Sequence, residues 1–495
     1  MKASTRFSRF IQSYNIRQGS RLGALVSCLL VSLNSWADNR PNIILMVADD
    51  HGREAFGAYG NDKIRTPHLD QLAKEGIKFD HAYATSASCS ASRSVILSGQ
   101  HNHANGQYGH NHSYHHFNTF NTVKSLPVRL SEAGYRTAQV GKYHIGPRAV
   151  YKFEQYLKVK DQSKDGSRNS VGMATAAKPL INAKSKKPFF LYLATNDPHR
   201  DHSTNSTGDN TFGNAPDDKG LGVKRLDYDP KEVIVPHYLP DTPETRRELA
   251  EYYQSVSRVD DTMGELVSLL KQADMYDNTV IFYLSDNGTA MPGAKTTLYD
   301  PGARLPLVIK PAGANDKHAG TTTQAMVSWP DLTPTILSLA QVNYQAEDFH
   351  GKSFTDVLAD PQKTHGFDQV YGSHTFHEIT MYYPMRSIRT RDYKLIWNIA
   401  SGLQYPFASD LQVSSTWQST MARNLTHFGA RTVEAYLHRP KFELYDMRPK
   451  VEQGVEATNL ADDADYQKIK FELIQKLQAF QKSTKDPWVY KWDYE

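Results

Sequence analysis

Two acidic pairs follow short apolar runs of the sequence. Asp49 and Asp50 come directly after the apolar residues 42–47, and Asp286 and Asn287 come at the end of a second such run. Adjacent carboxylates at the end of a buried strand repel each other strongly unless a cation lies between them. Four oxygen-bearing side chains without a cysteine–histidine cage favour Ca²⁺ over zinc, with Mg²⁺ as the alternative ion. Taken alone, each pair could also be a turn or a helix cap.

Basic side chains and histidines occupy similar positions further along the chain. Lys142 and His144 follow a strand expected at residues 136–140, His199 follows the apolar run at residues 189–194, and Lys295 lies shortly after Asp286 and Asn287. A single lysine is usually a solvated surface charge, and a single histidine is often a structural one. A catalytic role for these residues is therefore inferred only from their occurrence together with the carboxylates, in a fixed order along the chain.

The first 37 residues have the features of a secretory signal peptide. An apolar stretch at residues 22–33 precedes a small-x-small cleavage site at residues 35–37. The basic residues before it are Lys2, Arg6, Arg9, Arg17 and Arg21. This pattern predicts a secreted or periplasmic protein that has no membrane association beyond export. A membrane anchor and a lipoprotein signal at Cys28 are the alternatives, although the apolar stretch is short for a membrane-spanning helix.

Export changes the net charge and the cysteine content. The full chain has a net charge of +4 from 57 Lys and Arg residues and 53 Asp and Glu residues. Five of the basic residues and none of the acidic ones lie in the first 37, so the chain without this segment has a net charge of −1. The charge therefore gives no reason to expect nucleic-acid binding. Of the two cysteines only Cys89 remains, without a partner for an internal disulfide. Most free cysteines are small buried hydrophobic residues, so a chemical role for Cys89 depends on its surroundings.

The elements that must position these groups indicate an α/β fold. Strands at residues 42–47, 136–140, 189–194, 280–284 and 305–310 alternate with helices at residues 66–76, 125–134 and 244–273. Polar clusters at the strand ends favour a largely parallel sheet between helices, with the site at the carboxyl ends of the strands. We expect a catalytic domain at residues 38–370 and a smaller α+β subdomain at residues 371–495, which completes the substrate pocket.

The segment Cys89-Ser90-Ala91-Ser92-Arg93 resembles the signature of the sulfatase family, Cys-x-Pro/Ala-x-Arg. In that family the cysteine is oxidised after translation to formylglycine (3-oxoalanine). Further family-like segments recur in order between residues 41 and 482: Asp49-Asp50, residues 141–146, Pro198-His199, residues 286–288, Lys295 with residues 299–306, and residues 442–446. The resemblance implies an alkaline-phosphatase-like mixed sheet sandwiched by helices, with a smaller C-terminal α+β domain that carries an antiparallel sheet.

The resemblance also implies a role for each residue. The hydrated aldehyde at position 89 would attack sulfur beside one Ca²⁺. The ligands of the ion would be Asp49, Asp50, Asp286, Asn287 and residue 89 itself. Arg93 would hold the hydrate, and Lys142 and Lys295 would bind the sulfate oxygens. His199 would protonate the leaving group, and His144 would take the proton of the second hydroxyl.

A formylglycine-generating maturase is then a required partner. Ala91 stands where the commonest form of the signature has Pro. The Ala form is more similar to substrates of the radical-type bacterial maturase than to those of the oxygen-dependent enzyme. The sequence leaves open which of the two oxidises Cys89.

Other segments resemble the sulfamidase (heparan N-sulfatase) branch of the family and related bacterial polysaccharide sulfatases. They comprise residues 108–110, 115–118, 125–127, 197–200 and 377–387. This resemblance implies a sulfated sugar bound by His110, His116, Arg200, Arg304, His374 and His377. It leaves the bond open: an O-sulfated polysaccharide such as carrageenan or ulvan is favoured, with N-sulfoglucosamine of heparan-type glycans as the alternative.

Functions from other classes fit the sequence less well. The six histidines at positions 101, 103, 110, 112, 115 and 116 could bind a transition metal, although we favour a loop that lines the substrate pocket. A phosphatase or phosphonate hydrolase of the same superfamily would be expected to lack the Cys89 signature, and a two-metal version needs further ligands. An inactive glycan-binding protein would be expected to have lost Arg93, Lys142 or His199, and all three are present.

Overall fold

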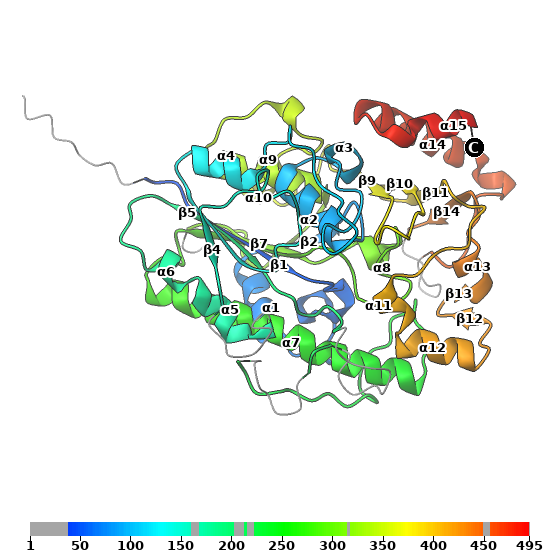
Figure 1. Ribbon diagram of the computed structural model, residues 1–495, viewed down its shortest axis with the longest axis horizontal. Helices are drawn as coiled ribbons and strands as arrows, with labels where there is room; N and C mark the ends of the chain where they lie inside the picture. Colours follow the sequence, from blue (N-terminus) through cyan, green and yellow to red (C-terminus); the bar gives the residue numbers. More distant parts are fainter. Residues whose placement is uncertain are drawn as a thin grey trace, which may run out of the picture. The chain divides into compact units, whose positions relative to one another are not determined.

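An eight-stranded sheet forms the centre of the chain in the computed structural model, which describes residues 38–159, 168–201, 212–214, 222–313, 317–448 and 456–494 (Figure 1). The predicted signal peptide lies outside these residues. The strand order is β4-β3-β5-β1-β6-β7-β2-β8. The strands are β1 (Asn42–Ala48), β2 (Ile77–Tyr83), β3 (Arg136–Gly141), β4 (Gln155–Leu157), β5 (Phe189–Ala194), β6 (Thr279–Ser285), β7 (Leu307–Lys310) and β8 (Thr321–Ser328).

The sheet is mixed, as the resemblance implied. β7 runs antiparallel to both of its neighbours, β6 and β2, whereas the other neighbouring strands pair in parallel. Parallel pairs place the carboxyl ends of β1, β3, β5 and β6 at one edge. Residues that follow these strands therefore meet at that edge.

Helices cover both faces of the sheet, and β1 is buried on each (Figure 1). Ile43, Leu45 and Val47 pack into one core layer, whereas Ile44 and Met46 pack into the other. The first layer lies under α2 (Cys89–Ser98), α4 (Leu126–Glu132), α9 (Leu332–Leu339) and α10 (Thr355–Ala359). The second lies under α1 (Pro67–Glu75), α5 (Ser170–Ala176), α6 (Lys178–Ile181) and α7 (Pro243–Gln272). A strand buried on both faces explains the continuous apolar run of residues 42–47.

The second sheet comes from the C-terminal part of the chain and is antiparallel. Its order is β14-β11-β10-β9, formed by β9 (Gln369–His374), β10 (Met385–Thr390), β11 (Tyr393–Asn398) and β14 (Phe442–Asp446). Helix α14 (Gln467–Ser483) packs its Leu473 and Leu477 against this sheet. Residues 40–495 form one compact unit, so the subdivision at residue 371 stays a prediction, although β9 begins near it.

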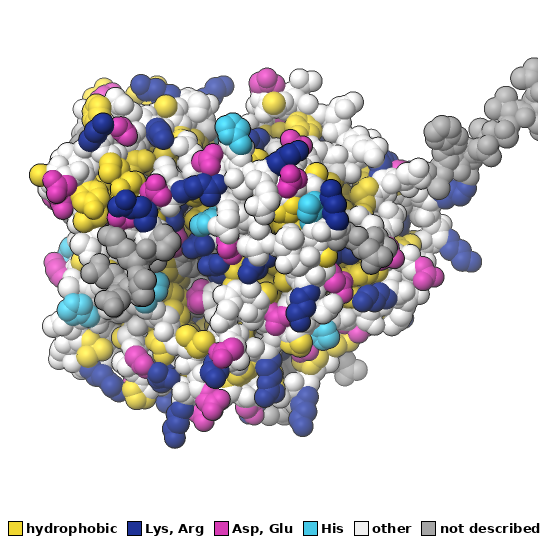
Figure 2. All heavy atoms as spheres, turned by 180° about the vertical axis from the view of Figure 1, so that it is seen from behind, with side chains coloured by type: hydrophobic (Ala, Val, Ile, Leu, Met, Phe, Trp, Pro, Cys, Tyr) yellow, Lys and Arg dark blue, Asp and Glu magenta, His cyan; other side chains and the backbone are white. Residues whose placement is uncertain are grey.

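Short elements complete the described chain. They are α3 (Asn102–Asn105), α8 (Asp300–Ala303), α11 (Ser409–Gln412), α12 (Ser415–Ala422), α13 (Val433–Leu437), α15 (Lys491–Tyr494), β12 (His427–Phe428) and β13 (Arg431–Thr432). No helix in the described part of the chain is long and apolar enough to span a membrane. On the face shown in Figure 2, Lys and Arg side chains are mixed with Asp and Glu, as on an ordinary solvated surface.

Candidate active site

Strands β1 and β6 bring the two acidic pairs together. They pair in parallel with Ala48 opposite Ser285, so that both pairs follow the same edge of the sheet. Asp49, Asp50 and Asp286 are fully buried, as is Asn287. The backbone amide of Asp50 donates to Oδ1 of Asp286 at 3.1 Å, and Asp50 has a φ of 71°. Few residues other than glycine adopt this left-handed conformation, so the surrounding structure must hold the turn in place.

Burial makes the negative charge of this cluster costly. It raises the pKa of Asp50 to about 6 and the pKa of Asp286 to about 7. Burial acts in the same direction on Asp49, but the charges of Lys142, His199 and Arg93 hold its pKa well below the usual value. Carboxylates in this state gain from any further positive charge placed among them.

The side-chain contacts of Asn287 indicate whether a cation fits this cluster. Its Oδ1 is buried without a hydrogen-bond partner among the described residues, while its Nδ2 donates to Oδ1 of Asp50 at 2.5 Å. A buried oxygen that lacks a partner is costly, and this one lies beside carboxylates. Ca²⁺ is held by carboxylate and amide oxygens of this kind. The donor set therefore fits a hard dication such as Ca²⁺.

Cys89 is the first residue of α2 and lies next to the acidic cluster. Its side chain is fully buried, and its Sγ lies 3.9 Å from Oδ1 of Asp50. Cys89, Asp49 and Asp286 each offer a potential ligand atom, and these atoms lie within 4.8 Å of one another. Burial raises the pKa of the Cys89 thiol well above its usual range. The unmodified thiol therefore stays protonated at neutral pH and is a poor nucleophile.

Arg93, one turn further along α2, links the two acidic pairs. Its Nε donates to Oδ2 of Asp286 at 2.8 Å, and its Nη2 donates to Oδ1 of Asp49 at 3.3 Å. Its Nη1 donates to the hydroxyl of Tyr192 at 3.1 Å. Because the guanidinium is fully buried and makes all of these contacts, it holds the carboxylates in register beside Cys89.

Two lysines contact the acidic cluster from different sides. Lys142, which follows β3, donates from Nζ to Oδ2 of Asp49. The Nζ of Lys295 donates to Oδ2 of Asp50 at 2.9 Å and to Oδ2 of Asp410 at 2.8 Å. The same Nζ lies 3.2 Å from Nε2 of His199. These cations can bind an anion that enters the site next to residue 89.

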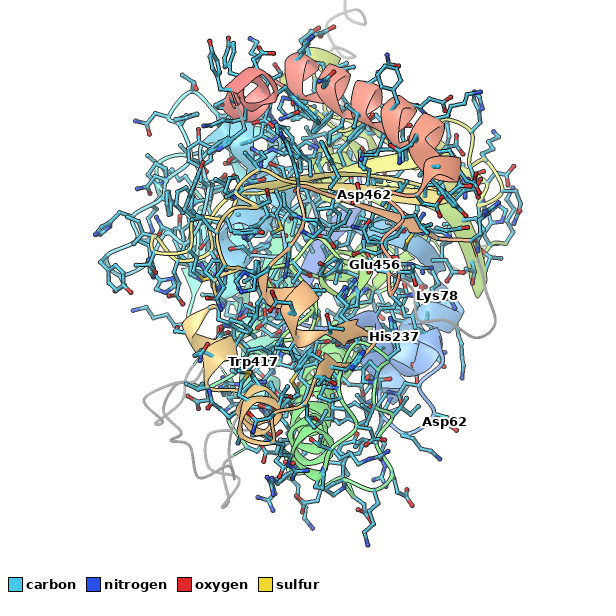
Figure 3. The ribbon with its side chains drawn as sticks, turned by 90° about the vertical axis from the view of Figure 1, so that its right-hand side faces the viewer. Asp62, Lys78, His237, Trp417, Glu456 and Asp462 are labelled. Carbon is cyan, nitrogen blue, oxygen red and sulfur yellow. The ribbon has the colours of Figure 1, made fainter. Side chains whose placement is uncertain are left out.

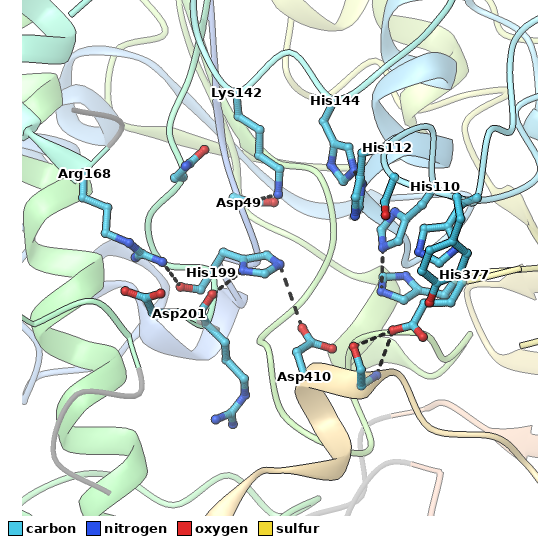
Figure 4. Close-up of a pocket in the computed structure, with 17 residues that line it drawn as sticks. Asp49, His110, His112, Lys142, His144, Arg168, His199, Asp201, His377 and Asp410 are labelled. Atoms are coloured by element: carbon cyan, nitrogen blue, oxygen red, sulfur yellow. Dashed lines mark hydrogen bonds and ion pairs between the residues drawn. The ribbon is translucent and has the colours of Figure 1, made fainter. Parts of the chain in front are cut away.

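The tautomer of His199 follows from its contacts. Its Nδ1 donates to the backbone oxygen of Arg200 at 2.6 Å, which leaves Nε2 directed at Asp410 (Figure 4). The same Nε2 lies 3.2 Å from Nζ of Lys295. Burial, followed by the charges of Lys295 and Lys142, holds the pKa of His199 well below its usual value. The imidazole is therefore neutral in the free protein, and an anionic substrate beside it would favour the protonated form.

A cavity of about 710 Å³ reaches Asp49, Lys142 and His199, whereas Cys89 and Lys295 are not among the described residues that line it (Figure 4). Its lining combines cationic and neutral basic groups with two acids from the C-terminal part of the chain. The lining residues are Asp49, His110, His112, Ser113, Tyr114, His115, Lys142, His144, Arg168, Asn196, His199, Arg200, Asp201, His377, Glu378, Ser409 and Asp410. This volume is in the range of cavities that bind small organic ligands.

His144 faces the cavity together with histidines of the 108–118 loop. It adopts a φ of 48°, and its Nε2 contacts Nδ1 of His112. The Nε2 atoms of His110 and His377 lie 2.9 Å apart, and Nδ1 of His377 lies 3.0 Å from the hydroxyl of Ser88. Histidines from three separate parts of the chain therefore form one wall.

The structure brings only some of the predicted sugar-binding residues to this cavity. His110, His377 and Arg200 line it. The guanidinium of Arg200, however, is buried and donates to Glu248 at 2.5 Å and to the backbone oxygen of Ala290 at 2.6 Å. Arg200 therefore holds neighbouring segments together and offers a substrate little of its charge.

The other three of those residues, His116, His374 and Arg304, are not among the described residues that line the cavity, and their role in sugar binding stays a prediction. His116 is exposed to solvent, because the loop turns it outward at a φ of 53°. His374 is buried at the end of β9, and its Nδ1 lies 3.3 Å from the hydroxyl of Ser86. Arg304 donates from Nε to the backbone oxygen of Asp80 at 2.8 Å.

Asp410 is the main site residue that sequence reasoning missed. It lies on α11, far along the chain from Lys295, and no recognisable motif surrounds it. Arg168, Asn196, His112 and Glu378 also line the cavity without having been predicted to bind substrate. Of these, His112 had a signal in the histidine-rich run, and Glu378 lies in the family-like segment 377–387.

Comparisons with known proteins match most of the chain. The family described as Sulfatase matches residues 41–342, and the family described as N-sulphoglucosamine sulphohydrolase, C-terminal, matches residues 294–411. The N-sulphoglucosamine sulphohydrolase of Homo sapiens is 36% identical over 487 residues, covering 93% of this chain and 94% of that protein. An ulvan-active sulfatase of Formosa agariphila is 29% identical over 469 residues, covering 92% of this chain and 83% of that protein. A solved structure of a protein in complex with its substrate D-glucosamine-2-N,6-O-disulfate has a TM-score of 0.65 at 23% identity, covering 90% of this chain and 99% of that chain.

Proposed function

The chain belongs to the sulfatase family, and on that premise we propose that it hydrolyses sulfate groups from a sulfated carbohydrate through an oxidised Cys89. One observation carries the proposal. Cys89 begins α2 directly beside a buried acidic cluster, and Lys142, Lys295 and His199 surround that point from other elements. A nucleophile, a cation site and anion-binding side chains thus meet in one place.

Oxidation of Cys89 to formylglycine is the modification that this proposal requires. A maturase would supply the oxidation, since the buried thiol itself is protonated and unreactive. The hydrated aldehyde then offers a hydroxyl as nucleophile, and the second hydroxyl allows sulfate to be expelled as the aldehyde reforms. Ala91 within the signature supports a radical-type bacterial maturase as the partner.

Ca²⁺ is the cation we propose for the acidic cluster, with Mg²⁺ as the alternative. Asp49, Asp50, Asp286, Asn287 and residue 89 would hold it, as the donor set and the partnerless Oδ1 of Asn287 support. A dication there supplies positive charge that stabilises the sulfate oxygens and lowers the pKa of a neighbouring hydroxyl.

The remaining side chains bind sulfate or transfer protons. Lys142 and Lys295 bind sulfate oxygens, and Arg93 holds the carboxylates beside residue 89. His199 donates a proton to the leaving group through Nε2, which its Nδ1 contact with Arg200 points toward Lys295. His144 accepts the proton of the second hydroxyl from its position on the cavity wall.

Hydrolysis of an N-sulfate or of an O-sulfate bond fits this chemistry. The comparisons favour the N-sulfate bond as the first to test. The match to the N-sulphoglucosamine sulphohydrolase C-terminal family covers Lys295, His377 and Asp410, which all belong to the site. N-Sulfated glucosamine is therefore the first substrate class to examine. An O-sulfated polysaccharide, which the sequence favoured, is supported by the relative named as an ulvan-active sulfatase.

The place of action we propose is outside the cytoplasm. The features of residues 1–37 support export to the periplasm or the medium. An exported enzyme also has direct access to a sulfated polysaccharide, because such polymers do not cross membranes unaided.

The test is sulfate release from two substrates run in parallel. The protein is co-expressed with a maturase, and mass spectrometry confirms an aldehyde at position 89. N-Sulfated glucosamine oligosaccharides and O-sulfated algal galactans and ulvan are then supplied separately. Sulfate together with a new free amine from the first alone identifies a sulfamidase, and sulfate from the second alone identifies a polysaccharide O-sulfatase. Release of phosphate from a phosphate or phosphonate ester, with no sulfate from any of these glycans, would overturn the proposal.

A further inference from the structure

Three histidines lie close together on one wall of the cavity. His110 and His112 come from the loop after α3, and His144 comes from the loop after β3. Each offers a ring nitrogen, and these nitrogens lie within 4.8 Å of one another. The ring centroids are 4.8 Å apart for His110 and His112, 4.9 Å for His110 and His144, and 4.5 Å for His112 and His144.

We propose that this histidine triad, His110, His112 and His144, binds a transition-metal dication such as Zn²⁺, and that the bound ion suppresses turnover. The triad contains no carboxylate, whereas the cluster around Asp49 and Asp50 consists mainly of oxygen donors. Imidazole nitrogens select Zn²⁺, Cu²⁺ or Ni²⁺, and carboxylate oxygens select Ca²⁺ or Mg²⁺. The two sites therefore take different ions.

Unpaired ring nitrogens support this assignment. The Nδ1 atoms of His110 and His144 are both buried without a hydrogen-bond partner in the described part of the chain. His110 is only 6% exposed. A buried nitrogen in this state is costly, and a metal ion would satisfy it. Burial also holds the pKa of both histidines well below the usual value, so each ring is neutral and carries the lone pair that a metal needs.

The arrangement resembles a three-ligand site with one open position. Zn²⁺ bonds to imidazole nitrogen at about 2.0–2.1 Å, so side-chain rotations would have to bring the three nitrogens somewhat closer together. His112 is exposed and lies on the cavity side, which gives the ion access. Lys142 places a positive charge near His144 and opposes the binding of a dication. Binding should therefore be weaker than in a closed four-ligand structural site.

Occupation of the triad has a consequence for catalysis. His144 is the residue proposed to accept a proton in the reaction, and a bound metal ion consumes the lone pair with which it would do so. The ion also fills space on the cavity wall that a sugar would occupy. This part of the inference rests on the proposed function, whereas metal binding itself does not.

Metal titration of the full mature protein tests the binding. Zn²⁺ is titrated calorimetrically in excess Ca²⁺, so that the oxygen-rich cluster is already occupied, and Co²⁺ absorption reports on imidazole ligands. We expect a single Zn²⁺ per chain, with affinity about tenfold or more weaker in His112→Ala, since even loss of a supporting contact costs that much. His116→Ala is the matched control, because His116 lies in the same loop but outside the triad. Equal Zn²⁺ affinity in wild type and His112→Ala would overturn the site.

Inhibition is measured separately on the wild-type enzyme. Zn²⁺ should reduce the rate of sulfate release with a midpoint that matches the calorimetric dissociation constant. Full activity at Zn²⁺ concentrations that saturate the triad would overturn the inhibitory role while leaving the binding site intact. If the protein releases no sulfate from any substrate, the proposed function fails, and the calorimetric titration still decides the metal site.

Discussion

At the scale of single residues, the site is built from buried charges that neutralise one another. Asp50, Asp286 and Asp49 meet Lys295, Arg93 and Lys142 at or near hydrogen-bond distance. Each of these side chains would be costly to bury alone. Their mutual contacts fix their positions before substrate arrives, which is the condition for electrostatic stabilisation of a developing charge.

Asp410 should act as a positioning residue for Lys295 and His199. In Asp410→Asn, Lys295 still contacts Asp50 but loses its ion pair with Asp410. That ion pair holds the Nζ of Lys295 close to His199. We expect kcat/KM for sulfate release to fall by up to about a hundredfold, the cost of misplacing a catalytic group by about 1 Å. The negative charge of Asp410 also raises the pKa of His199, so this pKa should fall in the variant. Because activity is lost when a general acid is deprotonated, the alkaline limb of the pH–rate profile should move to lower pH.

A matched substitution on the surface controls for this variant. Asp62 is exposed and points away from the body of the chain (Figure 3). Asp62→Asn should leave both the rate and the pH profile unchanged. An Asp410→Asn enzyme that folds and keeps the wild-type pH profile would show that Asp410 has a structural role alone.

At the scale of elements, the sequence predicts best the positions of residues that follow a strand. Asp49, Asp286, Lys142 and His199 follow β1, β6, β3 and β5, so their proximity follows from parallel pairing alone. The segment Cys89–Arg93 could be placed only by its family resemblance. Its position at the start of α2 is a property of the folded chain.

Side-chain direction and long-range contacts explain what the sequence could not predict. Arg304 matches a family-like segment, but its backbone pairs with Tyr83 and its side chain turns to Asp80. Asp410 reaches the site from a four-residue helix that carries no pattern of its own. β2 and β8 were not predicted because polar residues such as Lys78, Asp80 and Thr322 interrupt their apolar pattern.

The last residues of the chain should be fastened to the second sheet by a buried ion pair. Arg386 on β10 donates from Nε to Oδ2 of Asp486 at 2.6 Å and from Nη2 to Oδ1 at 2.9 Å, and both side chains are fully buried. Asp486→Asn would leave Arg386 buried without its counter-charge. We expect the free energy of unfolding, measured by denaturant titration, to fall by about 3–5 kcal/mol.

The pH dependence of this contribution has a defined sign. The charge of Arg386 outweighs burial and holds the pKa of Asp486 below its unfolded value. The stabilisation is therefore present above about pH 4 and is lost as the pH falls further. Asp241→Asn is the control, because Asp241 and Arg246 form a similar bidentate pair on the surface. Its removal should cost about 1 kcal/mol or less, and an equal loss in both variants would contradict the argument.

At the scale of the whole molecule, the acidic cluster links ion binding to stability. Asp49, Asp50, Asp286 and Asn287 come from strands in the middle of the large sheet. A cation bound only by the folded chain stabilises it by mass action. Chelation with EGTA should therefore lower the melting temperature and abolish turnover, and Ca²⁺ should restore both.

The cluster itself can be tested by a matched pair of variants. Asn287→Leu keeps the approximate size of the side chain but removes the ligand oxygen, so the Ca²⁺-dependent rise in melting temperature should disappear. Asn182→Leu, at an exposed position with a φ of −84°, should keep it. If EGTA lowered the melting temperature of both variants by as much as that of the wild type, Ca²⁺ would act elsewhere.

The proposed catalysis depends on the chemical state of residue 89. The most direct measurement is the rate of sulfate release from N-sulfated and O-sulfated glycans by protein made with and without a maturase. Mass spectrometry quantifies the aldehyde at position 89 in each preparation. We predict that the rate on the preferred glycan rises in proportion to the aldehyde fraction and is absent from protein with an intact thiol, which burial keeps protonated. Equal sulfate release from aldehyde-free protein, or from a Cys89→Ala variant, would contradict the mechanism.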